Sequence, residues 1–349
     1  MSFVSVKRRI DRFMANPGIR VNGLIITIIP GISIKRGEFS AELILKERDG
    51  KGSMTFFPLF PGVTLAYIFV NSPVWTAPDF HDNGSMETGP LLLNYCVTGR
   101  CELILNNGNF VYVKDGEISL TERFARQQYV YPRRIYEGIE FFVDMDTVNA
   151  QSSWVEAEFD IDFHRLRDLY CPDGGTYIAS VTTEIEEVLK KLWSLLDISV
   201  PLAIPQMKIY TLALFSLLQN LKEIPPSQAC TFFTETQVDI AKRVEKIITS
   251  DLRQHHPAWE LAAQFSVSET SLKNYFRRVY GQNISIYLRE VRMQRAAELL
   301  TTTNLSVSEI AEQVGYLNQS KFSSAFKKQF NASPLEFKRR KNLERNTSN

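Results

Sequence analysis

The sequence predicts a multidomain protein with a β-rich N-terminal part, a helical hairpin after it and an all-α C-terminal part. Three observations predict this organisation. Short β-branched and aromatic runs alternate with Gly-containing turns up to about residue 145. From about residue 160, apolar residues recur at the spacing of helix faces. The last hundred residues contain a degenerate duplication. The length of 349 residues suits two or three domains better than one hydrophobic core.

Composition and charge narrow the class of protein. With 44% hydrophobic and 23% charged residues, the chain is globular rather than disordered or fibrous. Its net charge of +1 hides an asymmetry, because residues 236–349 hold 18 Lys and Arg against 11 Asp and Glu. Residues 1–235 hold 22 against 28. We therefore expect only the C-terminal part to bind a polyanion, and a uniformly basic coat protein is excluded.

Cysteine usage and hydropathy indicate a soluble cytoplasmic protein. No run of 18 apolar residues is present, so no membrane span is expected. Lys7-Arg8-Arg9 precedes a short apolar run at residues 24–29, without the cleavage site of a secretion signal. The four cysteines form neither a CxxC pair nor a dense disulfide pattern: Cys96, Cys101, Cys171 and Cys230.

Residues 1–160 are predicted to form a β-rich sandwich or small barrel, whose strand order cannot be derived. Asn107-Gly108 predicts a tight hairpin in which both residues have positive φ. A second turn is expected at Lys114-Asp115-Gly116. The clearest strands are expected at residues 91–97, 101–105, 110–113, 117–120 and 139–145.

Residues 161–222 are predicted to contain two apolar helices, at 181–196 and 207–221, with Pro205 near the start of the second. The second helix is apolar on more than one face. Two interpretations have equal weight: the pair dimerises with a second subunit, or it braces the sheet within one chain. Residues 223–236 contain Pro225-Pro226-Ser227-Gln228 and no periodicity, which indicates an interdomain linker.

The duplication lies in residues 237–341, which precede a tail at 342–349. Each copy has a short helix, a turn and a second helix with one apolar face, the outline of a helix-turn-helix whose second helix enters the DNA major groove. A helix at 284–300, roughly 25 Å long, would hold the two copies about one DNA turn apart. The matching positions, at offsets of 49 or 50, are Leu261-Ala262, Ser266, Phe276 and Gly281 in the first copy and Ile310-Ala311, Gly315, Phe326 and Asn331 in the second.

A series of spaced residues extends through both copies: Leu261-Ala262, Ser268-x3-Leu272-x3-Phe276-Arg277, Gly281, Tyr287-Leu288, Arg292, Ala296-x2-Leu299-Leu300, Ile310-Ala311-x3-Gly315-Tyr316, Ser320-x-Phe322-x3-Phe326-Lys327-Lys328 and Ser333-Pro334-x2-Phe337-Lys338. With these residues, positions 240–341 resemble the AraC/XylS family of bacterial transcription regulators. The sequence departs from the family pattern at Ser266 and Asn331, where Gly is usual, and at Ser324, where a longer polar or cationic residue is common.

The resemblance implies a sequence-specific DNA-binding regulator, with activation favoured over repression. Its implied partners are promoter DNA, RNA polymerase, a small-molecule effector and a second copy of the chain. The implied N-terminal domain is a cupin-like barrel with a dimerising hairpin, which senses the effector. Two alternatives remain: a ligand-independent regulator whose N-terminal domain binds only itself or a protein, and an enzyme fused to a DNA-binding tail. Missing catalytic motifs weigh against the enzyme.

The outward faces of the two second helices supply the candidate DNA contacts, because Leu272 and Phe276 must point inward. For base edges we expect Thr270, Lys273, Asn274, Gln319, Ser320 and Ser324. For phosphates we expect Arg277, Arg278, Lys321, Lys327 and Lys328.

The N-terminal part has only weak ligand-binding candidates, His81, Tyr131, Arg133 and Arg134, with Tyr129 beside them. For His81, a surface or packed histidine is favoured over a ligand contact. A solvated loop explains the tyrosines and arginines as well as a pocket does. We expect no catalytic residue, no metal site and no cofactor, because the strand region lacks a His/Glu ligand set and the chain lacks phosphate-binding glycine loops.

Overall fold

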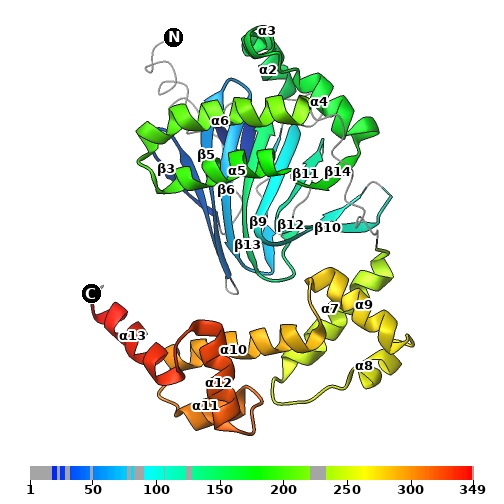
Figure 1. Cartoon of the computed structure of the whole chain (residues 1–349), viewed down its shortest axis with the longest axis vertical. Helices are drawn as coiled ribbons and strands as arrows, with labels where there is room; N and C mark the ends of the chain where they lie inside the picture. Colours follow the sequence, from blue (N-terminus) through cyan, green and yellow to red (C-terminus); the bar gives the residue numbers. More distant parts are fainter. Residues whose placement is uncertain are drawn as a thin grey trace. The chain divides into compact units, whose positions relative to one another are not determined.

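The computed structural model describes residues 18–21, 24–27, 32–47, 50–76, 80–81, 90–105, 107–122, 128–220 and 233–347. The chain divides into two compact units, Met1–Phe233 and Thr234–Asn349. The first is β-rich with a helical hairpin and the second is all-helical, which confirms the predicted fold class (Figure 1). Cys230 and most of the predicted 223–236 linker lie outside the described residues.

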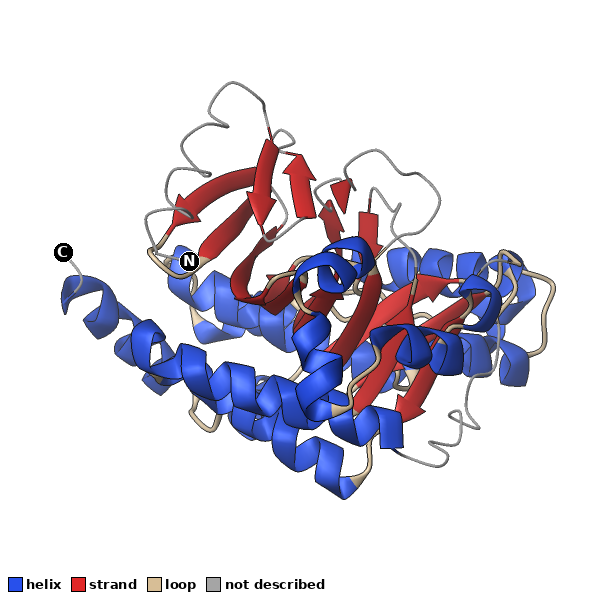
Figure 2. Cartoon of the chain, turned by 90° about the horizontal axis from the view of Figure 1, so that it is seen from above, coloured by secondary structure: helices blue, strands red, loops and turns tan. Residues whose placement is uncertain are grey.

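The N-terminal unit is built on an antiparallel sheet whose strands curl into a half-barrel (Figure 2). The strands along its main path are β3 (Ile32–Arg36), β4 (Ala41–Glu47), β5 (Gly50–Phe60), β6 (Val63–Asn71), β9 (Leu91–Ile104), β11 (Glu117–Thr121), β13 (Ile135–Val143) and β14 (Thr176–Ser180). They run side by side in the order β14-β11-β9-β13-β6-β5-β4-β3.

Six shorter strands complete the β structure described. β7 (Val74–Thr76), β10 (Phe110–Lys114) and β12 (Gln128–Val130) pair at the margin of the main sheet. β1 (Gly18–Val21), β2 (Leu24–Thr27) and β8 (Phe80–His81) form a separate small sheet. The order of all these strands depends on pairings between distant segments.

The two faces of the main sheet bury different sets of side chains. One face packs against α5 (Thr183–Ser194) and α6 (Val200–Asn220), which lie side by side across the strands in Figure 1. The other, inner face buries a second cluster that comes from strands and adjoining loops. Because side chains alternate along a strand, neighbouring residues of β13 belong to opposite clusters: Phe141 faces the helices and Phe142 faces the inner side.

Helix α6 braces the sheet through one side, where Met207, Phe215 and Leu218 are buried in the helix-facing core. By length and composition alone, Pro201–Asn220 would be long enough and apolar enough to cross a membrane. The opposite side of the helix exposes Leu202 and Ile209 to solvent. Bracing thus accounts for one apolar face of the helix, and the outer face leaves the dimerisation alternative open.

Short helices complete this unit: α2 (Met145–Gln151), α3 (Ser153–Phe159) and α4 (Phe163–Tyr170), with 3-10 turns at Pro172–Gly174 and Leu195–Asp197.

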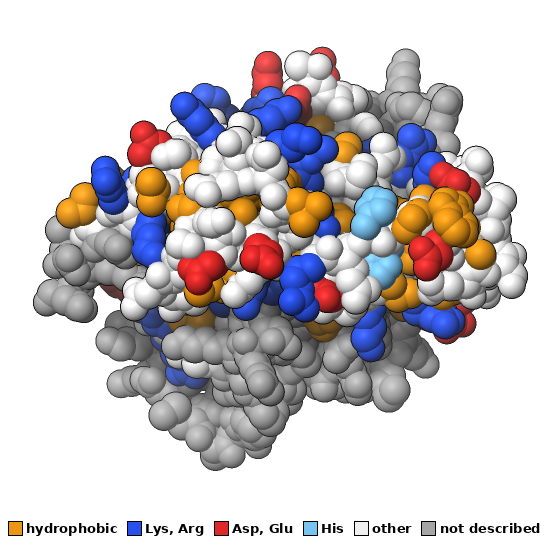
Figure 3. Space-filling view, turned by 90° about the horizontal axis from the view of Figure 1, so that it is seen from below, with side chains coloured by type: hydrophobic (Ala, Val, Ile, Leu, Met, Phe, Trp, Pro, Cys, Tyr) orange, Lys and Arg blue, Asp and Glu red, His pale blue; other side chains and the backbone are white. Residues whose placement is uncertain are grey.

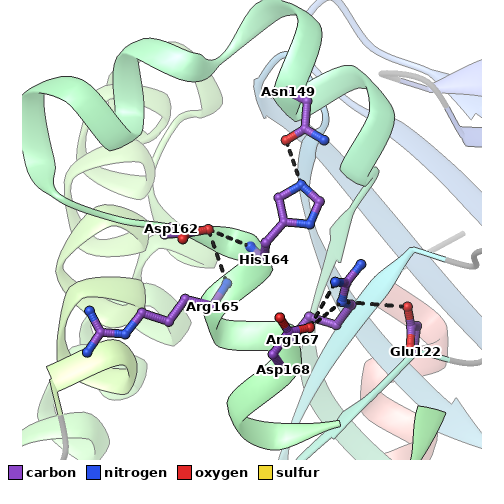
Figure 4. Close-up of polar contacts among 7 residues, drawn as sticks. All are labelled: Glu122, Asn149, Asp162, His164, Arg165, Arg167 and Asp168. Carbon is purple, nitrogen blue, oxygen red and sulfur yellow. Dashed lines mark hydrogen bonds and ion pairs between the residues drawn. The ribbon is translucent and has the colours of Figure 1, made fainter. Parts of the chain in front are cut away.

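Polar contacts hold the start of α4 in place, as Figure 4 shows. The Asp162 carboxylate accepts the backbone N–H groups of His164 and Arg165 at 2.8 and 3.1 Å. The His164 ring nitrogen Nε2 and the Asn149 side-chain oxygen form a hydrogen bond of 2.9 Å. Arg167 forms an ion pair with Asp168 and a longer one, at 3.9 Å, with Glu122. These contacts anchor the N-terminal end of α4.

Four local predictions were wrong in detail. The strands expected at 91–97 and 101–105 are one continuous strand, β9. Gly108 alone of the Asn107-Gly108 pair has positive φ, because the loop has three residues: Leu105 N–H donates to Asn109 O and Gly108 N–H donates to Leu105 O. The strand expected at 139–145 is β13, which starts at Ile135 and ends at Val143, since Asp144 caps α2. Helix α6 begins at Val200, which places Pro205 inside it.

The C-terminal unit consists of seven helices among the residues described: α7 (Glu235–Ser250), α8 (Ala258–Gln264), α9 (Glu269–Tyr280), α10 (Ile284–Thr302), α11 (Val307–Gln313), α12 (Gln319–Phe330) and α13 (Pro334–Thr347). The first begins with a capping box between Thr234 and Gln237, two residues ahead of the predicted domain start. The helices of each predicted copy are present, and α10 lies between them.

Candidate nucleic-acid interface

The first helix-turn-helix is formed by α8 and α9. The Ser268 hydroxyl caps α9 by accepting the N–H of Ser271 at 3.1 Å. Leu272, Phe276 and Val279 are fully buried on the inner side of α9, as their spacing predicted. In the turn, Ser266 has φ of +53°, a left-handed conformation that a side chain disfavours. The first turn therefore has a left-handed residue although Gly is absent.

The second helix-turn-helix is formed by α11 and α12. Ser306 and Glu309 form a capping box at the start of α11, and the Asn318 side chain caps α12 by accepting the N–H of Lys321 at 2.9 Å. Phe322 and Phe326 are fully buried beneath α12. Gly315 occupies the left-handed position of this turn with φ of +79°. The two copies thus repeat one backbone plan with different side chains.

All the candidate DNA contacts are on the outer faces of the two second helices and are exposed. Lys273 forms an ion pair with Glu269, one turn earlier on α9. Arg277 and Arg278 occupy the last turn of α9, as Lys327 and Lys328 do on α12, where cations also interact favourably with the helix dipole. In Figure 3, Lys and Arg side chains recur over the face shown, with acidic and hydrophobic side chains between them. Such a surface can bind a polyanion while its uncharged polar groups face base edges.

Helix α10 connects the copies and carries a residue to which the sequence assigned no role. The Arg292 guanidinium donates to the backbone oxygen of Leu252 at 2.6 Å and lies 6.0 Å from the ring centre of Tyr316. Leu252 lies in the loop before α8, and Tyr316 lies in the turn of the second motif. Arg292 therefore connects the loop that precedes the first motif with the turn of the second motif. Only the spatial proximity of three distant segments identifies this role.

The ligand candidates of the N-terminal unit occupy different environments. Tyr131 is buried in the inner core, with its ring 4.8 Å from that of Tyr136. Arg133 and Arg134 are exposed on the turn that follows it, where Arg134 N–H donates to Tyr131 O. The backbone of His81 ends β8, and its side chain lies outside the described residues. Within the described part of the chain, no group of three or more His, Cys, Asp or Glu side chains could hold a metal ion.

Comparisons with known proteins agree on the C-terminal unit. A family model described as a helix-turn-helix domain matches residues 261–340. Regulatory protein SoxS of Escherichia coli K12 is 34% identical over 80 residues, which are 23% of this chain and 75% of SoxS. The C-terminal domain of AraT, a response regulator from Geobacillus stearothermophilus, is 36% identical over 29% of this chain and 84% of that chain, with a TM-score of 0.28.

Similarity also extends beyond the helix-turn-helix region. The HTH-type transcriptional activator FapR of Escherichia coli is 23% identical over 263 residues, or 70% of this chain and 93% of FapR. In four other curated relatives, the match covers between 9% and 45% of the relative's own length.

Proposed function

The chain belongs to the AraC/XylS family of transcription regulators, and from this premise we propose that it binds promoter DNA through both helix-turn-helix motifs at once. The family consists of DNA-binding regulators rather than enzymes. The observation that carries the proposal is the presence of two such motifs in one compact unit, joined by the 19 residues of α10. A helix of that length spans about 28 Å, which approaches the ~34 Å of one DNA turn.

Each class of exposed side chain has a proposed task. Thr270, Lys273 and Asn274 of α9 contact base edges in one major groove, and Gln319, Ser320 and Ser324 of α12 do so in the next. The cations at the helix ends hold phosphates and set the register: Arg277, Arg278, Lys321, Lys327 and Lys328.

The direct test is selection of a binding site from random duplex DNA with the full chain, followed by footprinting of the selected site. We expect protection over two successive helical turns on one face of the duplex. Protection confined to a single turn would contradict simultaneous binding by both motifs. The absence of any sequence enrichment would contradict the regulator proposal itself.

Asn274 provides a sharper test of base readout, because an asparagine amide can form two hydrogen bonds with adenine. Asn274→Ala should weaken binding to the selected site by about 1–3 kcal/mol and leave random DNA almost unaffected. Asn304→Ala, an exposed asparagine between α10 and α11, is the matched control. An equal loss on both DNAs would show that Asn274 is not a base contact. Electrophoretic mobility shifts with both fragments measure the difference.

We also propose that the N-terminal unit senses a small molecule, mediates homodimerisation in the cytoplasm and thereby controls activation by RNA polymerase. Its curled sheet and its weak similarity to an activator along most of the chain support this proposal. A thermal-shift screen of the full chain against sugars, fatty acids, bile acids and aromatic acids tests it, since a ligand bound only by the native state raises the unfolding midpoint.

A ligand-independent regulator that dimerises is the second candidate, and the outer face of α6 supports the dimerisation that both candidates share. Leu202 and Ile209 are 68% and 64% exposed there, although large apolar side chains are usually covered. If this face serves dimerisation, Ile209→Glu should produce monomers in analytical ultracentrifugation. The variant tests whether the chain dimerises through α6, and the ligand screen tests whether it binds an effector. A dimer that no compound stabilises would indicate the ligand-independent regulator.

A further inference from the structure

Glu140 lies at the middle of β13, and its side chain faces the inner side of the curled sheet. Its direct neighbours across the sheet are Ala66 on β6 and Asn94 on β9, and Asn94 is in turn opposite Ser119 on β11. Phe142, two residues along β13 on the same face, belongs to the inner core. Glu140, Asn94 and Ser119 are 8%, 4% and 2% exposed. They form a buried polar row across three central strands.

Glu140 differs from the two other buried glutamates in the part of this unit that the structure describes. Glu102 accepts the hydroxyl of Tyr112 at 2.8 Å. Glu117 accepts the backbone N–H of Lys114 at 3.1 Å and pairs with its ammonium group at 3.3 Å. The Glu140 carboxyl has no hydrogen bond or ion pair with any residue that the structure describes. A largely buried carboxylate without a partner is costly, and a ligand that supplied a hydrogen-bond donor would lower this cost.

The surroundings of Glu140 are aromatic and rich in acceptors. The Tyr136 ring lies over Gly138, where an added Cβ would be 3.0 Å from the phenol oxygen. The Tyr136 hydroxyl donates to the side-chain oxygen of Asn94 at 2.7 Å, which leaves the phenol oxygen free to accept a further bond. The Tyr131 ring is tilted by 30° against the Tyr136 ring, and Phe142 contacts Phe56 with ring centres 5.8 Å apart.

We propose that Glu140 is the anionic anchor of a site for an organic ammonium ion, a primary amine attached to a small apolar body. This inference rests on the proposed sensing function and names its ligand class. The ammonium group would donate to the Glu140 carboxylate and to the phenol oxygen of Tyr136, and charge-assisted bonds of this kind are the strongest that a neutral core can offer. Aromatic faces such as those of Tyr131 and Tyr136 attract cations and cover the apolar body.

Binding of an ammonium ion at such a site should release a proton from the Glu140 carboxyl. Burial raises the pKa of Glu140 to about 8. Burial is the only cause of this shift. Glu140, Cys96 and Cys101 act electrostatically on the phenols of Tyr131 and Tyr136, as Tyr129 does on Tyr131, and all of these groups are acids. The free carboxyl is therefore mostly protonated at pH 7, and a bound ammonium ion must displace the proton.

The experiment compares benzylamine with benzyl alcohol, its neutral isostere, by isothermal titration calorimetry on the full chain. Glu140→Gln removes the charge and keeps the shape. Glu137→Gln, on the same strand but on the opposite, partly exposed side, is the matched control. Titrations in phosphate and in Tris buffer at pH 6, 7 and 8 measure the protons released on binding.

We expect benzylamine to bind the wild type and the Glu137→Gln variant, with affinity rising about tenfold from pH 6 to pH 7 and nearly one proton released. Benzyl alcohol should bind at least tenfold more weakly, and Glu140→Gln should abolish both the preference and the proton release. Equal binding of the amine by Glu140→Gln, or no binding of the amine by the wild type, overturns this inference. If a neutral or acidic compound from the screen binds instead, the sensing function stands without the amine site. If no compound of any charge binds, both fail.

Discussion

Ser266 and Gly315 occupy the same left-handed position in two copies of one motif, but their surroundings differ. A Cβ at Gly315 would lie 2.2 Å from the Leu252 backbone oxygen, whereas the Ser266 side chain is exposed. The second turn consequently admits only glycine, for two reasons. Its backbone is left-handed at this position, and a side chain there would collide with the loop that contains Leu252. The first turn tolerates serine because only the conformational cost applies.

Substitutions at these two positions should have opposite effects. Ser266→Gly should stabilise the C-terminal unit by about 0.5–1 kcal/mol, because relief of the left-handed strain exceeds the extra chain entropy of glycine. Gly315→Ala should destabilise it by at least about 2 kcal/mol, since strain and steric conflict add. Urea unfolding monitored by helical circular dichroism measures both free energies. A destabilised Ser266→Gly variant would show that the serine hydroxyl has a further role.

Stability at Glu140 should depend on pH in a defined direction. The pKa of its carboxyl is about 8 in the folded chain, against an ordinary value of 4.5, so the folded state binds the proton more tightly. Ionisation therefore costs stability increasingly between these two values and costs nothing below them. From pH 5 to pH 8, the wild type should lose roughly 3 kcal/mol relative to Glu140→Gln. Parallel pH dependence of the two unfolding free energies would contradict the buried, unpartnered carboxyl.

Among the elements, α10 acts through Arg292 as well as through its length. The guanidinium reaches Leu252, 40 residues earlier in the chain, and lies near the Tyr316 ring. Burial of this group lowers the pKa of Arg292. The side chain nevertheless replaces part of the lost hydration with a carbonyl contact and an aromatic face. Through these contacts, α10 holds the loop before the first motif and the turn of the second motif in fixed positions.

Loss of this connection should weaken binding to a complete site more than binding to half of it. Arg292→Met keeps the apolar stem but leaves the Leu252 carbonyl unpaired, a cost of about 1–3 kcal/mol in stability. The affinity advantage of the selected site over a site with one half randomised should shrink. Arg295→Met, on the exposed side of α10, is the control. An unchanged advantage would show that α10 alone sets the spacing.

Local patterns predicted the elements where local forces decide. The buried spacing of Leu272, Phe276 and Val279 placed α9, and its repetition placed α12, because a duplicated motif supplies the same evidence twice. The hairpin at Gly108 was mispredicted, since a turn type depends on loop length as well as on composition. Strand order, the connection through Arg292 and the isolation of Glu140 depend on residues far apart in sequence, so no local pattern contains them.

For the molecule as a whole, charge separates the two parts of the chain more clearly than composition does. Residues 236–349 hold 18 cationic side chains against 11 acidic ones, while residues 1–235 are net acidic. Charge of opposite sign in the N-terminal part should keep that part away from the phosphate backbone. DNA affinity should consequently depend on the C-terminal cations and on salt.

The number of proposed phosphate contacts, five, sets how steeply DNA affinity should fall with salt concentration. The logarithm of the binding constant should fall with the logarithm of salt concentration with a slope of about −4 to −5. Lys328→Gln should reduce the slope by about 1, and Lys246→Gln, exposed on α7 outside both recognition helices, should leave it unchanged. Fluorescence anisotropy over a range of potassium chloride concentrations measures the slope. A flat response would exclude phosphate binding as the main source of affinity.

Two unequal motifs on one polypeptide lack the internal twofold axis of a symmetric dimer of single-motif repressors. Where α9 presents Asn274, α12 presents Ser324, so the two ends of one operator cannot be interchanged. A bound monomer then points in one direction along the duplex, and inverting its operator would turn the regulator around with respect to the start of transcription. Orientation, and not merely occupancy, becomes information that the promoter can encode.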